Sequence, residues 1–215
     1  DSVFAPAEWK KAHEDQLQAV LAEKEDIYNA SSRYLAAAIY GSHPYHLSSN
    51  GTQESLARLT REQTADFFKR RAAASRMVIG VAGDVRAQEV QKILNETLGR
   101  LPKASPVPIP PFPEQEGFKQ PMRLRETMKR EQAVAMLAFR GMRIDDPRRY
   151  AYLVLNAVMS GSAGRLYQNI RGVHGMSYVI NSGLQMGVDP GHFAMYAGVK
   201  PDEGDRALDL LTEEA

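Results

Sequence analysis

The chain has 215 residues, of which 43% are hydrophobic and 25% charged, so it can bury a core as one large domain or two small ones. Its net charge is +1, which argues against a nucleic-acid partner, because such proteins usually carry a basic excess. The absence of cysteine excludes disulfides, cysteine zinc ligands and cysteine nucleophiles, and leaves the compartment unknown, since cytoplasm and periplasm are both compatible with it.

The first hundred residues predict mainly helices. Apolar residues at three- and four-residue spacings predict helix over residues 7–40, with a break near Asp26 and an end at Gly41. A loop rich in Gly, Ser, Pro and Asn follows. Thr60 and Gln63 form a capping-box signature that opens another helix.

The segment after that helix predicts a strand and then a further helix. The stretch "RMVIGVAG" (76–83) is short, apolar and β-branched, as strands are, and residues 86–98 return to a helical pattern. Seven prolines then fall within residues 101–121, where they disfavour regular structure and predict an extended connector. We therefore expect a first domain over 1–100, a linker over 101–121 and a second domain over 122–215.

The second domain alternates strands and helices. Its expected elements are a strand at 132–139, a helix after Pro147, a short helix at 165–171, strands near 176–184 and 191–199, and a helix after Pro201. The helix after Pro147 is expected to bury a stripe of four apolar residues, Tyr150, Leu153, Val154 and Val158. No apolar run approaches the ~20 residues of a membrane span.

Both ends of the sequence predict a section of a longer polypeptide. The last helix runs to the final residue without a capping signal, and the sequence does not begin with Met. We expect two α+β units, both truncated.

The polar residues taken singly favour ordinary structural roles. Glu23 lies on a helix beside other acidic residues, which is typical of a solvated carboxylate. His43 and His46 flank a proline with no acidic residue near in sequence, so an exposed turn is favoured over metal binding. Arg171 ends a helix and Tyr178 starts a strand seven residues later, a pair that by itself indicates a surface arginine and a half-buried sheet tyrosine.

Taken together, three stretches resemble the pitrilysin/insulinase family of zinc metallopeptidases, which includes the mitochondrial processing peptidase. They are "IYGSHPYHLSSNGTQESLARLT", "MVIGVAGDV" and "GSAGRLYQNIRGVHGMSYVINSG". Their order and spacing, with the proline-rich linker between two units, cover nearly the whole chain. The resemblance implies two similar α/β-sandwich units of the processing-peptidase type.

The resemblance also implies site residues. In that family an arginine and a tyrosine of the second, non-catalytic domain reach a zinc site in the first, and here they correspond to Arg171 and Tyr178. Glu23 corresponds to the family's third zinc ligand. A phenol can donate to the oxyanion of a tetrahedral intermediate, and a guanidinium can bind a peptide carbonyl or carboxylate.

The family's H-x-x-E-H motif, which supplies two zinc-binding histidines and a general base, is missing from this chain. One glutamate cannot hold a catalytic zinc, so we expect this chain alone to be inactive and to hold no zinc stably, while the parent protein uses zinc. The expected partners are a peptide substrate and another domain of the same protein or a homologous subunit. Two alternatives stay open: a non-enzymatic partner or structural subunit of a peptidase-like complex, and an unrelated small-molecule α/β enzyme.

Overall fold

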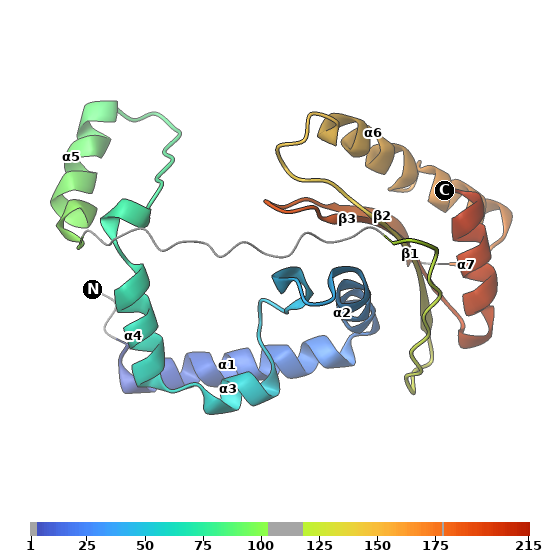
Figure 1. The fold of residues 1–215 in the computed structure, drawn as a ribbon, viewed down its shortest axis with the longest axis horizontal. Coiled ribbons are helices and arrows are strands. Elements are labelled where there is room, and N and C mark those ends of the chain that lie inside the picture. Colours follow the sequence, from blue (N-terminus) through green and yellow to red (C-terminus); the bar gives the residue numbers. More distant parts are fainter. Residues whose placement is uncertain (1–3, 103–117, 178) are drawn as a thin grey trace. The chain divides into compact units, whose positions relative to one another are not determined.

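The structure is a computed structural model that describes residues 4–102, 118–177 and 179–215 (Figure 1). The chain divides into two compact units, each built from segments that are not contiguous in sequence. One unit comprises residues 1–19 with 50–112, and the other comprises residues 20–49 with 113–215. The predicted linker at 101–121 falls largely outside the described residues, and the predicted domain boundaries stay a prediction.

The first unit is helical. It contains most of α1 (Pro6–Glu25), α3 (Gln53–Arg58), α4 (Arg61–Arg71) and α5 (Ala87–Thr97), with 3₁₀ turns η2 (Ala74–Arg76) and η3 (Leu98–Arg100). The predicted capping box is confirmed: Gln63 N–H donates to Thr60 Oγ1, and Thr60 N–H donates to the Gln63 side chain. These two bonds satisfy backbone donors that the first turn of α4 leaves without helical partners.

Side chains of α1 fasten this unit together. The Trp9 indole N–H donates to Thr64 Oγ1 at 3.2 Å, which joins α1 to α4. One turn along α1, His13 Nε2 donates to the carbonyl oxygen of Leu56 at 2.8 Å. The Trp9 and His13 rings stack with centroids 4.8 Å apart, so a single face of α1 holds both shorter helices.

The strand predicted at 76–83 is wrong. Residues 77–82 form neither helix nor strand, and Val78 is 100% exposed. A β-branched run becomes a strand only when a second strand accepts and donates its backbone hydrogen bonds. Within the described part of the chain, the sheet pairing involves other segments.

The second unit contains an antiparallel sheet and its covering helices. Its elements are α2 (Ile27–Tyr40), η1 (Pro44–His46), β1 (Ala133–Arg140), α6 (Arg149–Met159), the π-helical η4 (Tyr167–Val173), β2 (Val179–Gln185), β3 (His192–Val199), η5 (Pro201–Glu203) and α7 (Gly204–Glu213). The strand order is β1-β3-β2, with β3 in the centre. The predicted break between the first two helices is confirmed, because Asp26 caps α2 by accepting from Asn29 N–H.

The two faces of this sheet are covered by different helices. On β3, Phe193, Met195 and Ala197 are buried in the core that α6, η4 and α7 complete. Residues alternate across a strand, so His192 and Tyr196 point to the opposite face. There they meet α2: Tyr40 hydrogen-bonds to His192, and the rings of Tyr28 and Tyr196 lie 6.2 Å apart.

The buried stripe predicted for α6 is wrong. All four of its predicted members are exposed, at 46–64%: Tyr150, Leu153, Val154 and Val158. The helix instead turns Tyr152 and Met159 toward the core, and Asn156 accepts a hydrogen bond from Ser182 of β2 at 2.9 Å. Because α6 is apolar on both sides, its periodicity did not decide which side faces the sheet.

The mixed α+β fold class is confirmed, with helices beside a small antiparallel sheet. Among the described helices, none combines the length and the apolar character that crossing a bilayer requires.

Candidate functional site

Glu23 lies near the C-terminal end of α1, in the second compact unit. Its side chain is only 15% exposed, so it is not the solvated carboxylate that its sequence context favours. Ser48 Oγ donates to this carboxylate at 3.3 Å, and Arg33 Nε lies 3.7 Å from Glu23 Oε1. Two side chains from separate segments, α2 and the loop after η1, therefore surround the carboxylate.

Arg171 lies within η4, and its guanidinium carbon is 5.0 Å from the centroid of the Tyr167 ring. The fully buried Ile170, its neighbour in sequence, anchors η4 in the core while Arg171 stays half-buried. Gly175 follows η4 with φ +66°, a conformation that favours glycine and lets the chain turn toward β2. Arg171 therefore lies just before the turn that leads to β2, and its role at a zinc site stays a prediction.

Tyr178 lies outside the described residues, so the expectation that it shares one face with Arg171 stays a prediction. The structure describes the residues on either side of it. Ser177 is buried, and its hydroxyl hydrogen-bonds to the carbonyl oxygen of Gly198 at 2.7 Å. Val179 begins β2.

The exposed turn predicted around His43 is wrong. His43 is 3% exposed, and its Nε2 lies 3.2 Å from Oδ2 of Asp189, in the connection between β2 and β3. Local sequence gave no signal for this acidic partner, because it lies 146 positions further along the chain. His46 is half-buried, and its Nδ1 donates to the carbonyl oxygen of His43 at 2.7 Å.

A group of titratable side chains surrounds the same end of the sheet. Tyr40 is 3% exposed and its hydroxyl lies 2.8 Å from His192 Nδ1. Burial, with a smaller contribution from the Tyr45 phenol, raises the pKa of Tyr40 to about 12. Burial also lowers the pKa of His192. Both groups are therefore neutral near pH 7, and the Tyr40 O–H donates to the unprotonated Nδ1.

The described residues do not contain a complete zinc site. A catalytic zinc takes three protein ligands. Across residues 4–102, 118–177 and 179–215, no group of three or more His, Cys, Asp or Glu side chains could hold a metal ion. The Glu23 carboxylate can supply one ligand at most, so no catalytic step through a metal follows from this chain alone.

The second unit thus combines an antiparallel sheet with a single candidate metal ligand, Glu23, which Ser48 and Arg33 contact. Residues 58–215 match the family described as the Peptidase M16 inactive domain, and the chain belongs to that family. The resemblance to pitrilysin-type zinc peptidases found in the sequence is confirmed.

Curated relatives carry matching names. The chain is 28% identical over 199 residues to an uncharacterized zinc protease of Mycobacterium leprae, covering 92% of this chain and 45% of the relative. It is 27% identical over 183 residues to an uncharacterized zinc protease of Bacillus subtilis, covering 83% of this chain and 43% of the relative. The chain thus spans less than half the length of these relatives.

Solved structures show the same fold. A peptidase M16 inactive domain from Pseudomonas fluorescens superimposes with a TM-score of 0.81 at 23% identity, covering 98% of this chain and 51% of that one. A protease from Helicobacter pylori gives a TM-score of 0.75 at 17% identity, covering 94% and 52%. The periplasmic protease PqqL from Escherichia coli gives 0.63 at 15% identity, covering 98% of this chain and 24% of that one, so there the fold is part of a larger peptidase chain.

Proposed function

We propose that this chain is the non-catalytic portion of a zinc-dependent peptidase, in which it completes the substrate chamber and supplies Arg171 and Tyr178 to a zinc site elsewhere in the parent protein. The observation that carries the proposal is the match of residues 58–215 to the Peptidase M16 inactive domain. The incomplete ligand set supports it, because the described residues provide no group able to hold zinc. The substrate is a peptide, and the partner is another domain of the same protein or a homologous subunit.

The roles follow from the chemistry of the side chains. The Tyr178 phenol donates a hydrogen bond to the oxyanion that develops on the scissile carbonyl, and therefore acts mainly on the transition state. The Arg171 guanidinium binds a carbonyl or carboxylate of the peptide, and therefore acts mainly on substrate affinity. Glu23 contributes one carboxylate to a metal site whose other ligands come from outside this chain.

Kinetics of the full-length parent protein test these roles. Tyr178→Phe is expected to lower kcat by about 100- to 1000-fold with KM little changed, because one oxyanion donor is lost. Arg171→Ala is expected to act chiefly by raising KM. Tyr150→Phe and Arg86→Ala are matched controls, since these side chains are highly exposed and are not among the proposed site residues. Wild-type kcat in Tyr178→Phe would remove the tyrosine from the mechanism.

A second candidate function is that of a non-enzymatic partner subunit. One structural neighbour is a chain of Complex III2 from Candida albicans, with a TM-score of 0.70 at 15% identity over 88% of this chain and 46% of that one. The fold is therefore also used in a large assembly. The coding sequence of the parent protein separates the two: an H-x-x-E-H motif supports the peptidase, and its absence supports the partner subunit.

A further inference from the structure

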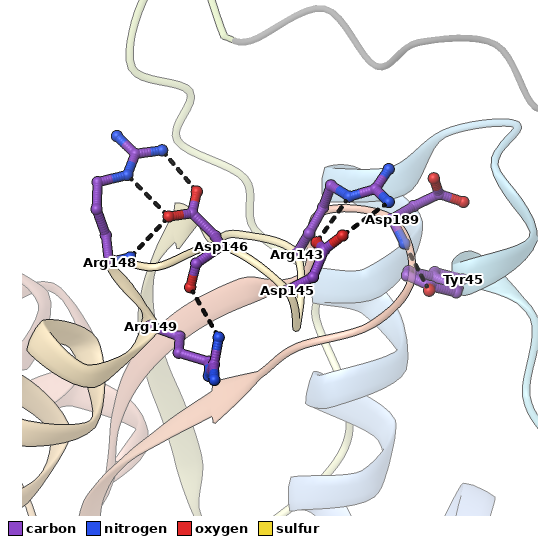
Figure 2. A network of polar contacts seen from close by, with 7 residues as sticks. All are labelled: Tyr45, Arg143, Asp145, Asp146, Arg148, Arg149 and Asp189. Atoms are coloured by element: carbon purple, nitrogen blue, oxygen red, sulfur yellow. Dashed lines mark hydrogen bonds and ion pairs between the residues drawn. The ribbon is translucent and has the colours of Figure 1, made fainter.

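Asp189, in the connection between β2 and β3, contacts two residues of the loop from His43 to Ser48. The Asp189 side chain faces the buried His43 ring, with Oδ2 3.2 Å from Nε2. The Asp189 backbone N–H donates to the Tyr45 hydroxyl at 3.2 Å, as Figure 2 shows. One residue of the sheet connection thus holds two residues of the loop.

The hydrogen bonds of the His43 ring show which of its two nitrogens donates. Tyr45 N–H donates to His43 Nδ1 at 3.2 Å, so Nδ1 is an acceptor. A neutral imidazole with an accepting Nδ1 carries its proton on Nε2. The Nε2–H therefore donates to the Asp189 carboxylate, and a charged acceptor makes this bond stronger than a neutral pair.

The other end of the same loop reaches Glu23. Ser48 Oγ donates to Glu23 Oε1 at 3.3 Å and lies 3.4 Å from Oε2. Between the two ends, η1 is a 3₁₀ turn of three residues, in which Leu47 N–H donates to the Pro44 carbonyl oxygen at 3.0 Å. His46 N–H also donates to the His43 carbonyl oxygen at 3.0 Å, so residues 43–47 are held together as one turn. The orientation of this turn, and with it the direction of Ser48, depends on the contacts that fix the loop from outside.

We propose that Asp189 is a positioning residue: through His43 and Tyr45 it fixes the loop that presents Ser48 to the Glu23 carboxylate. The relevance to catalysis rests on the proposed function, in which Glu23 is a metal ligand. Carboxylates that bind metals are commonly oriented by such outer hydrogen bonds. Asp189 acts through the loop and makes no contact with substrate in this proposal.

The test makes two measurements on the 215-residue chain. Nuclear magnetic resonance of ¹³C-labelled glutamate follows the Glu23 carboxyl group, and amide hydrogen exchange follows the opening of the loop. Asp189→Ala is expected to speed exchange at the Tyr45, His46 and Leu47 amides about tenfold, because the loop opens more often. It should also move the Glu23 carboxyl resonance toward its position in Ser48→Ala. Asp189→Asn retains an acceptor for His43 Nε2–H and should stay close to wild type.

Two controls separate positioning from general destabilisation. Asp145→Ala removes a carboxylate that is 68% exposed and paired with Arg143, and should leave the Glu23 resonance unchanged. The double variant of Asp189→Ala with Ser48→Ala should shift that resonance no further than Ser48→Ala alone. A Glu23 resonance that moves in Ser48→Ala but not in Asp189→Ala would overturn the proposal. A Glu23 resonance that stays unchanged in Ser48→Ala would overturn it as well. Failure of the proposed function would instead appear in the kinetics of Tyr178→Phe, which these spectra do not measure.

Discussion

The hydroxyl of Tyr40 and Nδ1 of His192 lie 2.8 Å apart and join the last residue of α2 to the first residue of β3. The contact spans 152 positions of sequence and lies on the sheet face opposite the main core. Both partners are uncharged near neutral pH, because burial raises the pKa of Tyr40 to about 12 and lowers that of His192. The pair therefore makes stability depend on pH in both directions.

We expect the free energy of unfolding to fall as pH drops below about 6.5, the usual pKa of an unfolded histidine. The folded pKa of His192 is lowered, so the unfolded chain binds more protons in this range, and acid favours unfolding. Urea denaturation between pH 5 and pH 8 measures the slope. His192→Asn should flatten it, whereas His174→Gln, at an exposed position, should not. An unchanged slope in His192→Asn would contradict the assignment.

At alkaline pH the free energy of unfolding should change with pH in the opposite direction. The folded pKa of Tyr40, about 12, lies above the usual value of 10, so between these values the unfolded chain loses a proton that the folded chain keeps. Stability should therefore fall as pH rises above about 10. Tyr40→Phe should remove this part of the loss, and Tyr150→Phe, whose side chain is 62% exposed, should leave it in place. Ultraviolet titration of the phenols provides the independent measurement.

Gly191→Ala should destabilise the second unit by about 1–3 kcal/mol, the usual cost of overpacking. A Cβ at this position would overlap the backbone carbonyl oxygen of Gln185, an atom that cannot move without distorting β2. Gly183→Ala is the matched control, because no atom lies within 4 Å of a Cβ built there. Equal unfolding midpoints in urea for the two variants would contradict the close approach at Gly191.

Leu211→Ala should lower the unfolding free energy by about 2–5 kcal/mol, because the side chain is fully buried between α7 and the sheet. Val154→Ala, which shortens a side chain that is 64% exposed on α6, should change it by less than about 0.5 kcal/mol. Urea denaturation tests both variants, because a shift of the midpoint at an unchanged m-value reports a change in the free energy of unfolding. A large effect at Val154 would mean that α6 is turned the other way in solution, and a small effect at Leu211 would contradict the burial of this face of α7.

The chain on its own should retain well under one zinc ion per molecule after dialysis against a chelator. The physical reason is that Glu23 alone offers one carboxylate where a catalytic zinc takes three protein ligands. Mass spectrometric metal analysis gives the stoichiometry, and Glu23→Gln should show the same residual value as the unmodified chain. A stoichiometric, chelator-resistant ion that disappears in Glu23→Gln would show that a metal site exists within this chain.

The sequence by itself determined the features that depend on neighbours within one helical turn. Two helix starts depend on hydrogen bonds between residues three positions apart: the cap at Asp26, and the capping box of Thr60 with Gln63. Such patterns can be recognised in the local sequence. The three strands of the second unit were also predicted, since β-branched and apolar runs between turn residues mark them. The order of the longer motifs indicated the family.

Only the tertiary structure decided which of these elements found partners. Residues 77–82 have the composition of a strand, but strand formation requires a second strand, which local composition cannot supply. Helix α6 is apolar on two sides, and only packing against β2 showed that Asn156 and Met159 face inward. The burial of His43 has the same cause: its partner Asp189 is 146 residues away, and a contact at that separation exists only once the sheet has formed.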